Sequence, residues 1–177
     1  MSAASDADAD WPAILKAEWI HLLNQSLARI RHCVAQLDES QLWWRPAEDL
    51  NSVGNLLLHV TGNLQQWAVD GILRRSSQRQ RQQEFLADGT HSGEQLLHEL
   101  RRVVAAAVSV ISETGVAELS ADRSIQGFQT TVLGALMHTV SHLVGHTHQI
   151  VLLTRMQLGT GYRYHWTPEM PRTGVPL

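Results

Sequence analysis

The chain has 177 residues, of which 44% are hydrophobic and 18% are charged, and its formal net charge at pH 7 is -3. This length suffices for one domain with a substantial core, and the composition argues against both a nucleic-acid-binding protein and a disordered chain. No apolar run approaches the roughly 18 residues that span a bilayer, and the acidic start is unlike a signal peptide. The single cysteine, Cys33, fits a reducing compartment, so we expect a soluble, cytoplasmic protein without a membrane partner.

The first half of the sequence predicts two helices. Asp10 can cap the first one, Pro12 fits its opening turn, and apolar residues follow at helical spacing. This helix should end before Trp43-Trp44-Arg45-Pro46, because proline disfavours helix in the preceding residue. The second helix should start at Asn51 or Ser52 and run to about Arg74.

The second half predicts two more helices and few strands. Ser92-Gly93-Glu94-Gln95 has the pattern of a capping box and opens the third helix. The fourth helix should begin near Thr130 or Thr131 and stop at Gly159-Thr160-Gly161. Residues 75–91 form a linker of about seventeen residues, which is longer than most helix-to-helix loops.

Four amphipathic helices predict an all-α protein with a four-helix bundle. The long linker allows a crossover between helices 2 and 3, which gives an up-down-down-up order with helices 2 and 4 antiparallel. We therefore expect a flexible N-terminus over residues 1–10, the bundle over residues 11–160 and a C-terminal tail over residues 161–177, with Pro168, Pro171 and Pro176 in the tail.

A cluster of histidines lies in the fourth predicted helix. His138, His142, His146 and His148 are four of the ten histidines of the chain. Residues four apart differ by only about 40° around a helix, so the first three form one stripe. His138 and His146 are about 12 Å apart along the axis, too far to share one ion, whereas neighbouring pairs are about 6 Å apart. His148 lies about 200° round from His146 and should face away.

A metal ion on this stripe needs a third ligand from another helix. His59, beside the apolar stripe of helix 2, is the best candidate. If helices 2 and 4 are antiparallel, the start of helix 2 is level with the later part of helix 4. This arrangement favours His142 and His146 over His138 and His142 as the partners of His59.

Several segments resemble the DinB-like (YfiT-like) superfamily of metalloenzymes, and more narrowly a branch catalogued as a domain of unknown function. The resemblance runs from about residue 12 to 170. It rests on Leu42-Trp43-Trp44-Arg45-Pro46, on residues 51–59 ending in Leu58-His59, and on residues 142–150, with further similarity at residues 79–85 and 125–128. It implies an up-down-down-up bundle that holds a divalent metal on His59, His142 and His146.

The resemblance also implies a function. Some relatives are thiol-dependent enzymes, so we expect a metal-dependent transferase or isomerase that uses a low-molecular-weight thiol and a small-molecule substrate. Three neutral imidazoles leave a divalent ion with an open position, the pattern of a catalytic site. Zn or Ni is favoured and Fe is also compatible with histidine ligands. The fold class leads us to expect a homodimer.

Other functions stay open at this point. Hydrolysis could use the same metal site, the protein could be a non-catalytic metal-binding stress protein, or the histidines could only pack in a structural bundle. Packing is the default interpretation of the remaining histidines, which are His21, His32, His91, His98 and His165, while His138 is undecided. The basic cluster at residues 74–81 is interpreted as part of a solvated linker, with packing across the bundle end or at a subunit contact as the alternative because the resemblance covers this linker. We expect no nucleic-acid partner.

Overall fold

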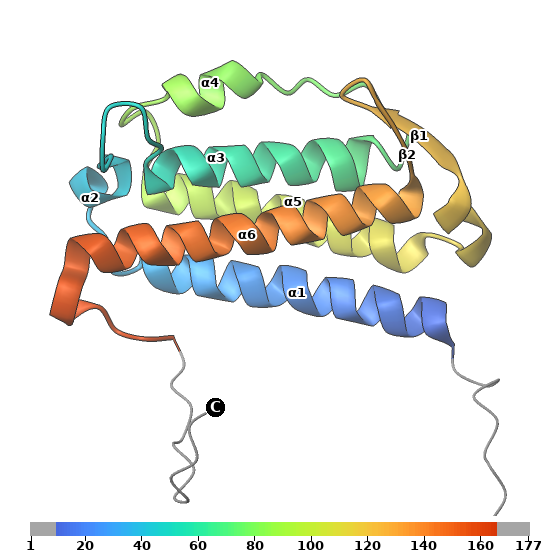
Figure 1. Cartoon of the computed structure of the whole chain (residues 1–177), viewed down its shortest axis with the longest axis horizontal. Coiled ribbons are helices and arrows are strands. Elements are labelled where there is room, and N and C mark those ends of the chain that lie inside the picture. Colours follow the sequence, from blue (N-terminus) through green and yellow to red (C-terminus); the bar gives the residue numbers. More distant parts are fainter. Residues whose placement is uncertain (1–9, 166–177) are drawn as a thin grey trace, which may run out of the picture.

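The computed structural model describes residues 10–165. Residues 1–9 and 166–177, which hold the expected flexible N-terminus and the prolines of the expected tail, lie outside this range. The protein is mostly helical, with its long helices packed lengthwise and one hairpin at one end (Figure 1). These helices are α1 (Trp11–Val34), α3 (Val53–Leu64), α5 (Gly93–Glu113) and α6 (Val132–Leu158). None of the helices within residues 10–165 combines the length and the hydropathy that a membrane crossing requires.

Side-chain caps confirm the predicted helix starts. The Asp10 carboxylate accepts from the backbone N–H of Ala13, the third residue of α1, at 3.1 Å. Ser52 and Ser92 each form a capping box at the starts of α3 and α5. Thr131 caps α6, and Gly159, with a φ of 52°, follows its last turn as expected. The caps satisfy backbone groups that a helix end would otherwise leave unpaired.

The first helix is shorter than predicted. It ends at Val34, and a separate helix α2 (Glu39–Trp43) precedes the proline segment. The Asp38 side chain accepts from the Gln41 backbone at 2.8 Å, and the Gln41 side chain accepts from the Asp38 backbone at 3.0 Å. This capping box starts a new helix where the spacing of apolar residues suggested a continuous one.

A two-stranded hairpin precedes α6, in a region whose residues showed little strand signal. After the short 3-10 helix η3 (Val116–Ser120), β1 (Asp122–Ile125) pairs antiparallel with β2 (Phe128–Thr131). The turn residues Gln126 and Gly127 both have positive φ, of 54° and 81°. Positive φ at both central positions is typical of a two-residue hairpin turn that matches the twist of the strands.

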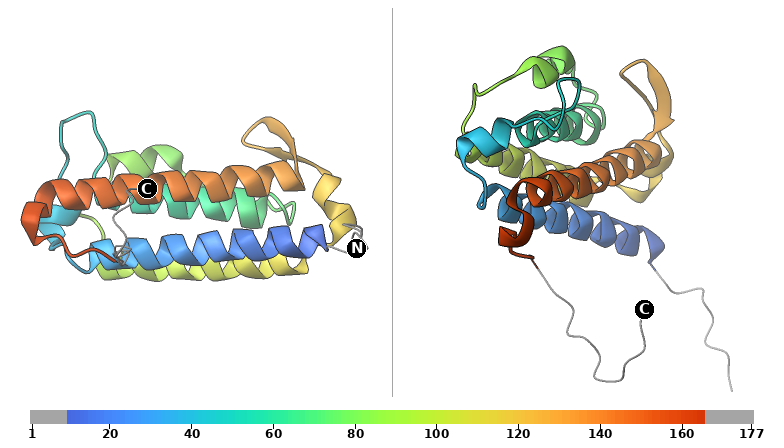
Figure 2. Two further views of the ribbon diagram at one scale, coloured as in Figure 1. Left: turned by 60° about the horizontal axis from the view of Figure 1, so that its bottom comes forward. Right: turned by 60° about the vertical axis from the view of Figure 1, so that its left-hand side comes forward.

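The connection between α3 and α5 returns along the outer side of α3. The last turns of the predicted second helix follow α3 as a π-helix, η2 (Gln65–Asp70). The connection to α5 then contains the short helix α4 (Arg81–Leu86). Figures 1 and 2 show α4 above α3, so that α5 begins at the same end of the molecule as α3, beside α2. Gly93 at the start of α5 accordingly donates its backbone N–H to Glu39 of α2 at 3.1 Å.

Trp43 anchors this end of the core. Its side chain is 8% exposed and its Nε1 donates to the His91 carbonyl at 3.1 Å, whereas the adjacent Trp44 is 38% exposed. The ring lies against Gly54 of α3, where an added Cβ would come within 2.8 Å of ring carbons. Only a residue without a side chain lets α3 approach the ring this closely.

We predict that Gly54→Ala destabilises the protein although alanine favours helix. The methyl group forces the Trp43 ring or α3 to shift, at a cost of about 1–3 kcal/mol for overpacking. Chemical denaturation measures the change. Gly145→Ala in α6 is the matched control, because nothing lies within 4 Å of its added Cβ. The control should be neutral or stabilised by up to about 1 kcal/mol, and equal effects at both positions would contradict the packing argument.

Candidate metal centre

Three imidazole rings meet between α3 and α6. His59 lies in the middle of α3, and His142 and His146 lie one turn apart on α6. The His142 Nε2 atom is 3.2 Å from Nε2 of His59 and 3.2 Å from Nε2 of His146. One nitrogen of each ring lies within 4.8 Å of the other two. The fold thus brings together the three histidines singled out from the sequence, which come from two distant segments.

The spacing of these nitrogens suits a shared ion. Zinc binds imidazole nitrogen at about 2.0–2.1 Å, so two such nitrogens on one ion lie about 2.8–3.4 Å apart at bond angles of about 90–110°. Both 3.2 Å separations fall in this range. Hydrogen bonds between the rings cannot satisfy all of these nitrogens, because a neutral ring carries one N–H and the His142 Nε2 faces two other ring nitrogens. The three histidines could therefore hold one metal ion.

A buried carboxylate orients the first ring. The His59 Nδ1 atom is 3.0 Å from Glu84 Oε2, and both side chains are less than 10% exposed. An ionised carboxylate only accepts hydrogen bonds, so the Nδ1 atom carries the proton and the Nε2 lone pair is directed at the other two rings. A histidine that donates its second N–H to a carboxylate is the usual arrangement beside a bound metal.

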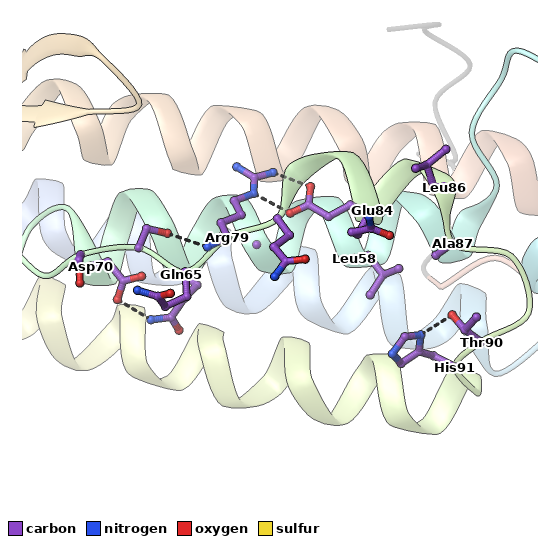
Figure 3. A pocket seen from close by; sticks show the side chains of 15 residues that line it. Leu58, Gln65, Asp70, Arg79, Glu84, Leu86, Ala87, Thr90 and His91 are labelled. Carbon is purple, nitrogen blue, oxygen red and sulfur yellow. Dashed lines mark hydrogen bonds and ion pairs between the residues drawn. The ribbon is translucent and has the colours of Figure 1, made fainter.

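Arg79 holds this carboxylate in place. Its Nε donates to Glu84 Oε1 at 2.6 Å, and its Nη2 donates to Glu84 Oε2 at 2.8 Å and to the His59 carbonyl at 3.2 Å (Figure 3). Burial alone would raise the pKa of Glu84, but hydrogen bonds from Arg79 and His59 outweigh it and lower this pKa. The Glu84 carboxylate therefore stays ionised as the partner of His59.

Gln149 orients the third ring. Its Oε1 lies 2.6 Å from the His146 Nδ1 atom, one turn further along α6. An amide oxygen only accepts, so Nδ1 donates and the His146 Nε2 lone pair also points into the cluster. The His142 Nδ1 is buried and has no hydrogen-bond partner among residues 10–165.

Their surroundings keep the α6 ligands neutral. Burial, followed by the neighbouring His146 and His59, lowers the pKa of His142 to about 3. Burial is also the main cause that lowers the pKa of His146. A neutral imidazole is the form that coordinates a metal, because protonation occupies the lone pair. His142 and His146 could thus bind a cation near pH 7 without first losing a proton.

The other histidines of α6 do not belong to the converging group. The His138 ring lies next to it, 5.6 Å from the His142 ring between centroids, and packs in a tilted arrangement against Trp67 with centroids 4.2 Å apart. His148 faces α1, where its Nε2 lies 3.3 Å from Arg29 Nη1, as its angle around the helix predicted. Within residues 10–165, the converging group also excludes the histidines for which packing was the default, which are His21, His32, His91, His98 and His165.

Two residues that position the clustered histidines were not predicted from the sequence. Arg79 and Glu84 were included in a solvated linker, and that interpretation is wrong for these two side chains, which are 5% and 9% exposed. The available signal was an arginine and a glutamate five residues apart beside a phenylalanine, which also fits an exposed short helix. Their burial follows from the path of the connection over α3, which local sequence does not reveal.

Comparison with known proteins agrees with this fold. A DinB-like protein from Bacillus cereus, solved by crystallography, superimposes with a TM-score of 0.63 at 16% identity, over 78% of this chain and 90% of that one. A conserved protein from Enterococcus faecalis gives a TM-score of 0.61 at 19% identity, over 81% of this chain and 96% of that one. At these identities the likeness concerns the fold. No curated protein matches the sequence.

The family is identified by sequence. Residues 15–169 match the family described as "Protein of unknown function (DUF1572)", which covers most of the chain. One of the structural neighbours is described as DinB-like, and it shares the helical fold of this chain. The chain therefore belongs to the DUF1572 family, whose function is unknown.

Proposed function

We propose that this protein is a metal-dependent enzyme in which His59, His142 and His146 hold one divalent ion and a low-molecular-weight thiol is a co-substrate for transfer or isomerisation. The convergence of three Nε2 atoms, with two separations of 3.2 Å, carries the metal part of the proposal. The thiol part rests on the resemblance of the sequence to a superfamily that includes thiol-dependent enzymes. Zn or Ni is favoured, because neutral imidazoles suit both ions.

Three protein ligands leave room at the ion for another molecule. When bound there, a divalent ion lowers the pKa of a thiol or water and acts as a Lewis acid. The chain's own residues prepare the ligands, since Glu84 and Gln149 fix the protonated nitrogens of His59 and His146. Phe85 covers one side of the cluster, with its ring centred 4.9 Å from the His59 ring.

The enzyme proposal also draws on a small cavity near the cluster, which none of the three histidines lines. A cavity of about 220 Å³ lies one turn beyond the ligands and is lined by Gln149 of α6 and Leu56 of α3, among others. Its remaining walls include Pro46, Leu50 and Leu153, so it would suit an apolar part of an electrophilic substrate. Because Gln149 also holds His146, this cavity and the proposed metal share one residue.

Two further features of the protein, its helix order and its oligomeric state, belong to this proposal. The four long helices would form an up-down-down-up bundle, which is supported by α3 and α5 both starting beside α2. The protein would form a homodimer, for which exposed apolar side chains of α1 and α6, such as Trp11 at 67% and Met137 at 51%, offer contact area. Light scattering measures this association.

We predict that protein purified without an affinity tag contains close to one equivalent of a divalent transition metal, and that His142→Ala loses most of it. His142 provides the nitrogen nearest to both other ligands, so its removal leaves only two imidazoles. Elemental analysis by mass spectrometry measures the content. His98→Ala on the exposed face of α5 is the matched control and should retain the metal. Full metal content in the His142→Ala protein would disprove this ligand assignment.

We predict that Glu84→Gln weakens metal binding by roughly 10–100-fold, the usual cost of losing such a supporting residue. An amide can turn its NH2 group toward His59 and favour the wrong tautomer. Competition with a chromophoric chelator measures the affinity, and circular dichroism checks the fold. The exposed Glu94→Gln variant serves as control. If Glu84→Gln folds and binds metal like the wild type, Glu84 does not position His59.

We predict turnover of an electrophile only when both metal and a small thiol are present. Metal-loaded protein is assayed with a set of biological thiols and electrophile classes, and chelation should abolish the rate. The matched chelated sample and the His142→Ala protein report the background. Stoichiometric metal without turnover for any pair would instead support a non-catalytic metal-binding protein, while turnover without thiol would point to hydrolysis.

A further inference from the structure

A second, larger cavity lies on the other side of α3. It occupies about 820 Å³ between the outer face of α3 and the connection that leads to α5 (Figure 3). This volume is within the range of about 300–1,000 Å³ that is typical of small-molecule sites. None of the three clustered histidines lines it. The cavity is therefore not the open side of the proposed metal centre.

The inner wall of this cavity is the buried Arg79–Glu84 pair. Both residues line it, and Figure 3 shows them joined above α3. Gly62 of α3 also lines it, and an added Cβ there would collide with the Glu84 carboxylate. The glycine thus lets the ion pair lie directly on the helix, which forms a fixed polar surface at the base of the cavity.

Neutral hydrogen-bonding groups dominate the rest of the lining. Side-chain amides come from Gln65, Gln78, Gln80 and Gln83, and hydroxyls come from Ser76 and Ser77. The Gln65 amide donates to Asp70 at 2.8 Å, but its Oε1 is buried with no partner among residues 10–165. A buried acceptor without a donor costs free energy, so a rotation of the Gln65 side chain that lets a ligand hydroxyl or a water reach this oxygen would be favourable.

Charge at the cavity disfavours anions. Arg79 is the only arginine or lysine among the lining residues, and its guanidinium is already engaged by Glu84, by the His59 carbonyl and by Gln66. A phosphate or carboxylate would therefore find no free guanidinium or ammonium group and would also approach Asp70. Leu58 and Leu86 add apolar surface beside the amides, on which the C–H face of a ring can pack.

We propose that this cavity binds an uncharged, polyhydroxylated small molecule, with hydroxyl groups paired to the glutamine amides and one ring face against Leu58. The proposed binding does not require the metal-dependent reaction, because none of the three clustered histidines lines the cavity. Its occupant would nevertheless touch the reverse side of the Glu84 carboxylate that orients His59, so the two sites share one wall.

The test is calorimetric and NMR titration of the full chain with a panel of methyl hexopyranosides, in metal-free and metal-loaded protein. We expect saturable binding in both forms, and glucose 6-phosphate should bind more weakly by about tenfold or more, or about 1.4 kcal/mol. Leu58→Trp fills the cavity and should weaken the binding of the hexosides by at least about tenfold. The matched control is Leu133→Trp on the exposed surface of α6, which lines none of the cavities described here and should bind as the wild type does.

A second variant, Gln65→Leu, tests the site in case Leu58→Trp does not fold. Gln65→Leu keeps the side-chain volume and removes the unpartnered acceptor, so it should also weaken the binding of the hexosides. Circular dichroism confirms that each variant is folded. The proposal is overturned if no methyl hexopyranoside binds saturably, if glucose 6-phosphate binds as well as the hexosides, or if folded Leu58→Trp and Gln65→Leu both keep wild-type affinity.

Discussion

The contact between His59 and Glu84 is the interaction on which the rest of the centre depends. Partial burial of three neighbouring imidazoles costs free energy unless hydrogen bonds fix which nitrogen of each ring is protonated and the remaining nitrogens share a partner. Glu84 fixes the proton of His59 at 3.0 Å, and Arg79 neutralises the carboxylate that does so. A buried carboxylate without that arginine would be costly, so the pair and the imidazole form one unit.

The connection between α3 and α5 is therefore part of the site. Asn55 at the start of α3 donates to the carbonyls of Glu84 and Ala87, at 3.0 and 2.8 Å, and holds α4 against the helix. Arg45 donates to the carbonyls of Phe85 and Ala87 from the other side. These hydrogen bonds satisfy the backbone of a segment that has few apolar residues to bury. Hydrogen bonds, and not apolar packing, therefore hold most of this segment in place.

Local sequence predicted the features that depend on local chemistry. The caps at Asp10, Ser52, Ser92 and Thr131 are side-chain choices that act within three residues, so the helix starts could be located. The three converging histidines could be selected because helical spacing and one antiparallel pairing determine which rings can meet. Glu84 could not be selected, because its burial depends on the path of the connection over α3. The hairpin was missed because its strands are four residues each and lack alternation of apolar residues.

The ligands and their support come from widely separated parts of the chain. Glu84 is 25 positions from His59, and His142 is 83 positions from it. No short fragment contains a complete set, so the centre can form only after α3, α4 and α6 have all come together. Such contacts are late events in folding, because distant segments must first lose their freedom to move. An ion bound there would prefer the fully assembled chain over every partly folded one, and its affinity would add directly to the free energy of unfolding.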